Sequence, residues 1–182
     1  MKKDILYDQY RLTGKWSNHV SLRLLLLNRV FRRLYYYRKL RHSTGFVFIM
    51  FQCLNQMLHR KMSLEIPRSV KLGKGVLLLH PYSITFNSGC EIGENFTICK
   101  GATIGNSKTK KAGAPIIGDN VYVGLNAVIV GGVKIGSNVL IAPNAFVNFD
   151  VPNDSVVIGN PGQIHHKERA AEPYIVNSIW NV

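Results

Sequence analysis

His80 is the side chain in this sequence with the clearest chemical potential. It lies in the run Leu78-Leu79-His80-Pro81. An imidazole titrates near neutral pH, so it could take a proton from a hydroxyl group that attacks an electrophile. The six histidines show no HxxxH spacing, so we predict no metal site. A purely structural histidine at a turn is the simpler alternative.

A cluster of lysines is the second chemical feature. Lys108, Lys110 and Lys111 lie in the segment 106–115, which contains no Val, Ile or Leu and ends at Pro115. This composition predicts a loop that leaves the regular structure around it. Such loops often carry function, and lysine ammonium groups are suitable partners for phosphates. A solvated lysine-rich excursion is the alternative.

The element that must position these residues is a six-residue repeat. Its aliphatic residues are Ile66, Leu72, Leu78 and Ile84, then Ile92, Ile98 and Ile104, then Ile117, Val123, Ile129, Ile135, Ile141 and Val147. A fixed period of this length predicts a mainly β fold, a parallel β-helix in which three strands make one coil. We expect this domain to span residues 63–164, with Phe86 pointing inward where the period is interrupted after Ile84.

The segment 1–62 differs in composition and is predicted to be helical. Residues 1–65 hold 13 Lys and Arg against 3 Asp and Glu, whereas residues 66–182 hold 10 against 7, so most of the net charge of +13 is N-terminal. We expect one helix from Val20 to Arg41 and a second from Phe46 to His59. The apolar run 46–51 is too short to span a membrane.

Two interpretations of the basic segment stay open. The helices could pack on the solenoid and on neighbouring subunits, or residues 20–41 could contact an anionic membrane surface. Nucleic-acid binding is not expected, because no recognised motif accompanies the charge.

The residues 165–182 lack the period and are expected to cap the open end of the solenoid as a helix or an extended segment. Three cysteines without a CxxC pair, and no visible signal peptide, indicate reduced thiols in a cytoplasmic protein.

Residues 63–164 resemble the left-handed β-helix acyltransferases with hexapeptide repeats, in particular the serine acetyltransferase branch and its sugar-modifying relatives. The run 78–84 matches the position of that branch's catalytic histidine, and the run 98–105 with the following loop matches its approach to the cofactor loop. The run Gly159-Asn160-Pro161-Gly162 is similar to the family's terminal Gly-x-Pro-Ala.

The resemblance implies a homotrimer that transfers an acetyl group from acetyl-CoA to an alcohol. His80 would be the general base, and Glu91 is our candidate for the carboxylate that orients it. The resemblance also implies a set of cofactor-binding residues: Gly105, Lys108, Lys110, Lys111, Gly124, Ala142, Asn160 and Pro161. Each active site would lie between two subunits.

Two departures from the serine acetyltransferase pattern guide the choice of acceptor. Leu79 stands where that branch has an aspartate, and Ala114 stands where it has a second histidine. We therefore predict a sugar hydroxyl of a bacterial capsular or other surface polysaccharide, or of its precursor, as the acceptor, with the enzyme at the inner face of the membrane. Serine O-acetylation is the alternative within the same chemistry. A non-catalytic scaffold that binds glycans or membrane is the alternative from another class.

Overall fold

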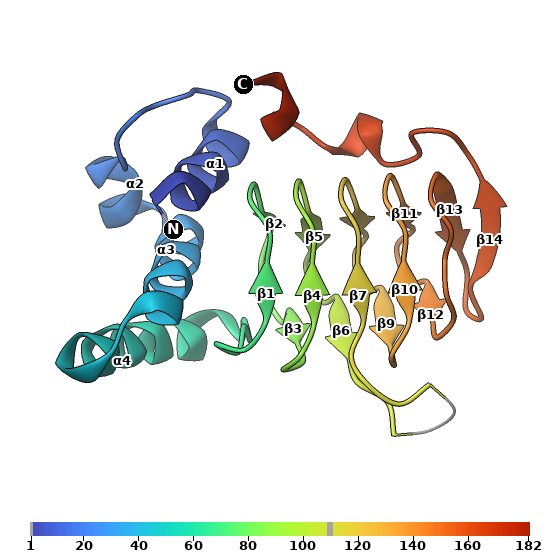
Figure 1. Ribbon diagram of the computed structural model, residues 1–182, viewed down its shortest axis with the longest axis horizontal. Helices are drawn as coiled ribbons and strands as arrows, with labels where there is room; N and C mark the ends of the chain where they lie inside the picture. The colour runs from blue at the N-terminus through green and yellow to red at the C-terminus, as the bar shows by residue number, and fades with distance from the viewer. Residues whose placement is uncertain (1, 109–110) are drawn as a thin grey trace.

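The computed structural model describes residues 2–108 and 111–182, without the side chains of residues 58–62. Four helices stand at one end of a parallel β-helix, and the C-terminal tail runs back along its side (Figure 1). The repeat therefore forms the predicted parallel β-helix.

Each coil passes through three sheets in turn. The first sheet consists of β1 (Lys71–Leu72), β4 (Glu91–Ile92), β7 (Ile116–Ile117) and β10 (Lys134–Ile135). The second contains β2 (Leu77–Leu79), β5 (Thr97–Cys99), β8 (Tyr122–Val123), β11 (Leu140–Ile141) and β13 (Ser155–Ile158), with β14 (Gln163–His166) antiparallel at its edge. The third consists of β3 (Thr85–Phe86), β6 (Thr103–Gly105), β9 (Val128–Val130) and β12 (Phe146–Val147).

The aliphatic residues of the repeat form the core. In the second sheet Leu78 lies in register with Ile98, and Ile98 with Val123, so that like side chains stack from coil to coil. Phe86 is buried at 1% exposure and packs edge-on against Phe96, which confirms its predicted inward role. The burial of this continuous aliphatic column is the main source of stability for a solenoid.

The N-terminal helices are α1 (Lys2–Thr13), α2 (Leu22–Leu27), α3 (Arg29–His42) and α4 (Gly45–Met62). The single helix predicted from Val20 to Arg41 is therefore wrong, because the chain breaks at Asn28. This residue is extended, with φ −101° and ψ 106°, and its side chain accepts a hydrogen bond from the Phe31 amide at 2.9 Å. Asn28 thus caps the N-terminus of α3, a role in which asparagine is strongly preferred.

Helix α3 joins the helical end to the first coil. Its apolar face is buried, and so are two of its arginines, Arg33 and Arg38. Arg38 forms an ion pair with Asp8 of α1 at 2.9 Å and donates to the Leu72 carbonyl at 2.7 Å. Part of the basic charge between residues 20 and 41 therefore serves packing. Among the described residues, no helix has both the length and the apolar character needed to cross a membrane.

The C-terminal tail does not cap the end of the solenoid as predicted. β14 pairs with the edge of β13, and the chain then returns along the corner between the first and second sheets through the turns η1 (Glu172–Tyr174) and η2 (Ile179–Asn181). Asn177 donates to the Arg11 carbonyl at 3.0 Å, and the Ile179 amide donates to the Asn95 side chain at 2.9 Å. The tail thus links the coils to α1.

Candidate active site

His80 lies at the corner between the second and third sheets, which we call the His80 corner (residues 80–84). From Leu78 to Phe86 the inward positions are eight residues apart, whereas the next coil needs six, from Ile98 to Ile104. The two additional residues make this corner irregular. His80 and Ser83 both adopt a left-handed conformation, with φ of 49° and 56°. Histidine is among the residues that tolerate this conformation, which is uncommon without glycine.

The surface around His80 is open to solvent. His80 itself is exposed, and Tyr82 retains 51% of its accessible surface. On the next coil the Lys100 amide donates to the Leu79 carbonyl at 3.1 Å, which places Lys100 beneath the corner. Leu125 follows one coil further and is 44% exposed. A substrate could therefore reach the imidazole, which can exchange a proton with it.

Glu91 does not lie beside His80 of its own subunit, so the prediction that it orients this imidazole is wrong. It belongs to β4 of the first sheet, where it forms a 2.6 Å ion pair with Lys71. Eleven residues separate His80 from Glu91, which is about half a coil rather than a whole one. The carboxylate therefore emerges from a different face.

Glu65 is a carboxylate near the His80 corner that the sequence prediction did not consider. It forms a parallel bridge with Thr85, the first residue after the His80 corner, and its carbonyl accepts from the Phe86 amide at 2.9 Å. The nine other acidic residues lie on the first sheet, at its two corners, in α1 or in the tail: Asp4, Asp8, Glu91, Glu94, Asp119, Asp150, Asp154, Glu168 and Glu172. The repeat could have pointed to Glu65, because this residue directly precedes Ile66, the first aliphatic residue of the six-residue period.

The predicted loop leaves the solenoid between β6 and β7 (Figure 1). Ser107 and Gly113 exchange two backbone hydrogen bonds of 3.1 Å at its base. Lys111 pairs with Asp150 at 2.7 Å, and this hydrogen bond holds the pKa of the Asp150 carboxyl below its usual value. Lys111 is thus not a free cation, whereas Lys108 is exposed. Lys110 lies outside the described residues.

Several predicted cofactor residues line up beneath the His80 corner. Gly124 and Ala142 occupy the same corner on later coils, and Asn160 and Pro161 follow on the last one. A Cβ atom on Gly124 would lie 2.6 Å from the Pro143 nitrogen, so packing alone requires glycine there. Gly105 lies instead at the loop end of the third sheet. Within one subunit, the width of the third sheet separates the His80 corner from the loop.

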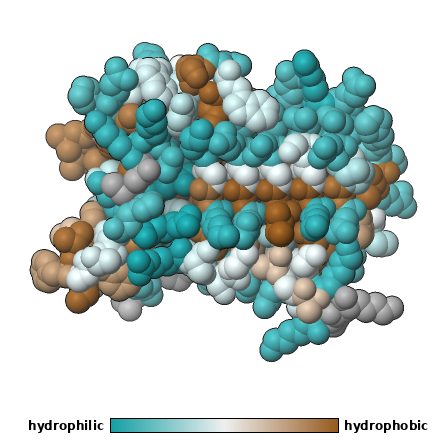
Figure 2. Space-filling view, in the orientation of Figure 1, coloured by the Kyte–Doolittle hydropathy of each residue, from teal (hydrophilic) through white to brown (hydrophobic). Residues whose placement is uncertain are grey.

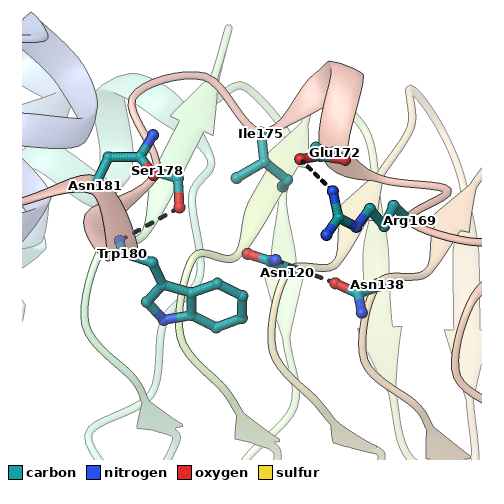
Figure 3. A pocket seen from close by; sticks show the side chains of 8 residues that line it. All are labelled: Asn120, Asn138, Arg169, Glu172, Ile175, Ser178, Trp180 and Asn181. Carbon is teal, nitrogen blue, oxygen red and sulfur yellow. Dashed lines mark hydrogen bonds and ion pairs between the residues drawn. The ribbon is translucent and has the colours of Figure 1, made fainter.

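A cavity of about 380 Å³ lies away from this site, under the tail (Figure 3). The lining includes Asn120, Asn138, Arg169, Glu172 and Trp180. Asn120 donates to Asn138 at 3.1 Å, and its own buried side-chain oxygen has no hydrogen-bond partner among the described residues. This cavity is at the corner between the first and second sheets, so it does not include His80.

Residues 114–148 match the family model "Bacterial transferase hexapeptide (six repeats)", and the coils superimpose on solved left-handed β-helix enzymes. The fold is therefore a left-handed β-helix similar to that of the hexapeptide-repeat transferases. Among these, the chain is similar to serine acetyltransferases.

The serine acetyltransferase of Staphylococcus aureus (strain Mu50) is 39% identical over 102 residues, which are 56% of this chain and 48% of the relative. That of Staphylococcus epidermidis is 39% identical over 106 residues, or 58% and 50%. The chain thus spans about half the length of the curated relatives it matches. The crystal structure of Neisseria gonorrhoeae serine acetyltransferase aligns with a TM-score of 0.75 at 27% identity, over 91% of this chain and 66% of that one.

These relatives overturn the predicted polysaccharide acceptor. The similar proteins are serine acetyltransferases, which supports the alternative reading and not a capsular or other saccharide substrate. The two departures that suggested a sugar do not by themselves identify an acceptor. Leu79 lies opposite Cys99 in the pairing of β2 with β5, and Ala114 packs against the core.

Proposed function

We propose that this protein is an acetyl-CoA-dependent O-acetyltransferase whose acceptor is the hydroxyl group of serine. The observation that carries the proposal is the likeness to serine acetyltransferases across the coils that hold the exposed His80. The scaffold fits the chemistry, because the irregular corner presents one imidazole to solvent at the end of a row of small residues.

In the proposed reaction, His80 removes the hydroxyl proton as the oxygen attacks the thioester carbonyl carbon. The tetrahedral oxyanion then collapses, the carbon–sulfur bond breaks, and the CoA thiolate leaves. The imidazolium returns the proton to that thiolate, so the enzyme is unchanged after each turnover. General base catalysis of this kind contributes roughly 10²–10⁴-fold.

For acetyl-CoA, the small residues Gly124 and Ala142 would allow the extended pantetheine arm to lie against the coils. Exposed Lys108 would contact the phosphates as a flexible point charge. A related serine acetyltransferase has been solved in complex with CoA, which supports the same co-substrate here.

We also propose a homotrimer with active sites between subunits. The third sheet separates the His80 corner from the loop of the same subunit, so the loop of a neighbouring subunit would complete each site. A closed ring of identical interfaces satisfies this requirement. Exposed Tyr82 and Leu125 at the His80 corner provide apolar surface for that contact.

Thiol release from acetyl-CoA in the presence of L-serine tests the proposed function. We expect saturable turnover within the usual enzyme range of about 1–10³ per second. L-alanine, which lacks the hydroxyl group, is the matched blank. Thiol release that is equally fast with L-alanine, or none with L-serine, would contradict the proposal.

Glu65 is our candidate for the residue that positions the imidazole. We expect Glu65→Gln to lower kcat about tenfold or more, a part of the whole base contribution. It should leave the KM for acetyl-CoA unchanged, because Glu65 is proposed to act through His80 and not on the cofactor. Glu91→Gln is the control and should leave both quantities unchanged. A wild-type kcat for Glu65→Gln, or a loss that appears in KM instead of kcat, would show that Glu65 does not position His80.

A further inference from the structure

The helical end of the molecule exposes apolar side chains that nothing in the structure covers. Helix α2 contains five leucines and buries none of its residues, and Leu22, Leu26 and Leu27 are 63–73% exposed. Phe46 at the start of α4 is 80% exposed. Figure 2 shows brown, hydrophobic areas at this end of the molecule, opposite β14.

Helix α4 has an apolar stripe on its solvent side, in addition to the face that contacts α3. One face contacts α3, where Asn55 bonds to Arg33 and Phe51 packs against Tyr36. The other carries a solvent-facing stripe at helical spacing: Phe46, Ile49, Met50, Cys53 and Met57. A helix normally turns its apolar stripe towards a packing partner, so this stripe requires an occupant.

The charge around α2 and α4 indicates what kind of partner covers their exposed apolar side chains. Residues 9–64 contain eleven Lys and Arg and no Asp or Glu. Arg23 and Arg29 are exposed beside the α2 leucines. A second copy of this end would bring the same excess of positive charge, because residues 1–65 hold 13 Lys and Arg against 3 Asp and Glu, and one of these three, Asp8, is buried in its ion pair with Arg38. An anionic lipid surface offers both opposite charge and an apolar layer that needs no shape complementarity.

We propose that α2 and the solvent-facing stripe of α4 bind the surface of an anionic lipid bilayer. The leucines and the Phe46 stripe enter the boundary between headgroups and acyl chains, and the arginines contact lipid phosphates. This places the contact on α2 and α4 rather than on the whole of residues 20–41, because the apolar face of α3 is buried. The inference does not depend on the acceptor of the acetyl group.

Vesicle sedimentation with the full chain tests the proposal. We expect binding to vesicles of phosphatidylcholine with about 30% phosphatidylglycerol at low salt, several-fold weaker binding at high salt, and little binding to pure phosphatidylcholine. Phe46→Ser/Met50→Ser should reduce the partition coefficient about tenfold or more, and Arg23→Gln/Arg29→Gln about fivefold per charge. All four residues are exposed, so the fold should persist.

Ile158→Ser/Ile164→Ser is the matched control, since both residues are exposed at the opposite end of the molecule. Its binding should equal that of the wild type. Loss of binding in this control, equal binding to both kinds of vesicle, or no binding to either would overturn the proposal. A lower solution mass of Phe46→Ser/Met50→Ser, without vesicle binding by the wild type, would assign the stripe to a second copy instead.

Discussion

Replacement of His80 by alanine is expected to lower kcat by about 10²–10⁴-fold, because this is what a general base typically contributes. The irregular corner presents this imidazole to solvent, and no other histidine with a described side chain stands at that corner. Binding of acetyl-CoA should persist, since the small residues proposed to contact it lie on later coils. Steady-state kinetics with L-serine, together with calorimetric titration of CoA, measure both quantities.

The matched control for this prediction is His19→Ala. His19 is also exposed, but it lies between α1 and α2, away from the coils. Its kinetics should equal those of the wild type. Retention of more than a tenth of the wild-type kcat in His80→Ala would show that the hydroxyl proton has another acceptor.

The solenoid was predictable because its period is a direct consequence of its geometry. Each coil buries one aliphatic residue per strand, so the six-residue repeat reports both the strands and the core. The inward role of Phe86 was predictable in the same way, since only an inward residue could restore the phase. The break itself was placed after Ile84, whereas in the structure the two additional residues lie between Leu78 and Phe86, at the His80 corner.

That Glu65, and not Glu91, shares a sheet with the His80 corner was not predictable, because coil lengths vary. The pairing of Glu65 with Thr85 spans 20 residues, that of Thr85 with Thr103 spans 18, and that of Glu91 with Ile116 spans 25. Proximity along the chain therefore says little about proximity across coils. Glu91, near in sequence, lies on another sheet, whereas Glu65, further away, shares the sheet that begins at the His80 corner.

The helical end and the tail depend on contacts that no local pattern reports. The break at Asn28 follows from a single capping hydrogen bond, within a segment that otherwise reads as continuous helix. The path of the tail is set by its hydrogen bonds to Arg11 and Asn95, which are distant in sequence. The acceptor was also misjudged, because Leu79 and Ala114 reflect packing as well as function.

Arg38→Met is expected to lower the free energy of unfolding by about 3–5 kcal/mol, because it leaves the Asp8 carboxylate buried without its partner. The two side chains are only 5% and 2% exposed, and Asp8 also accepts from the Val76 amide at 2.9 Å. Burial alone would lower the pKa of Arg38, but the Asp8 carboxylate more than offsets it and raises that pKa above its ordinary value. Urea unfolding at fixed protein concentration measures the change.

The double variant Asp8→Asn/Arg38→Met should recover part of this loss, because it removes the uncompensated charge along with the pair. Lys71→Met is the surface control: its ion pair with Glu91 is 63% and 46% exposed, so its loss should cost at most about 1 kcal/mol. A cost for Arg38→Met no larger than for Lys71→Met would mean that Asp8 finds water or another donor. In that case the helical end would be joined to the coils mainly by apolar packing of α3, and the exposed stripe of α4 would belong to a more loosely attached unit.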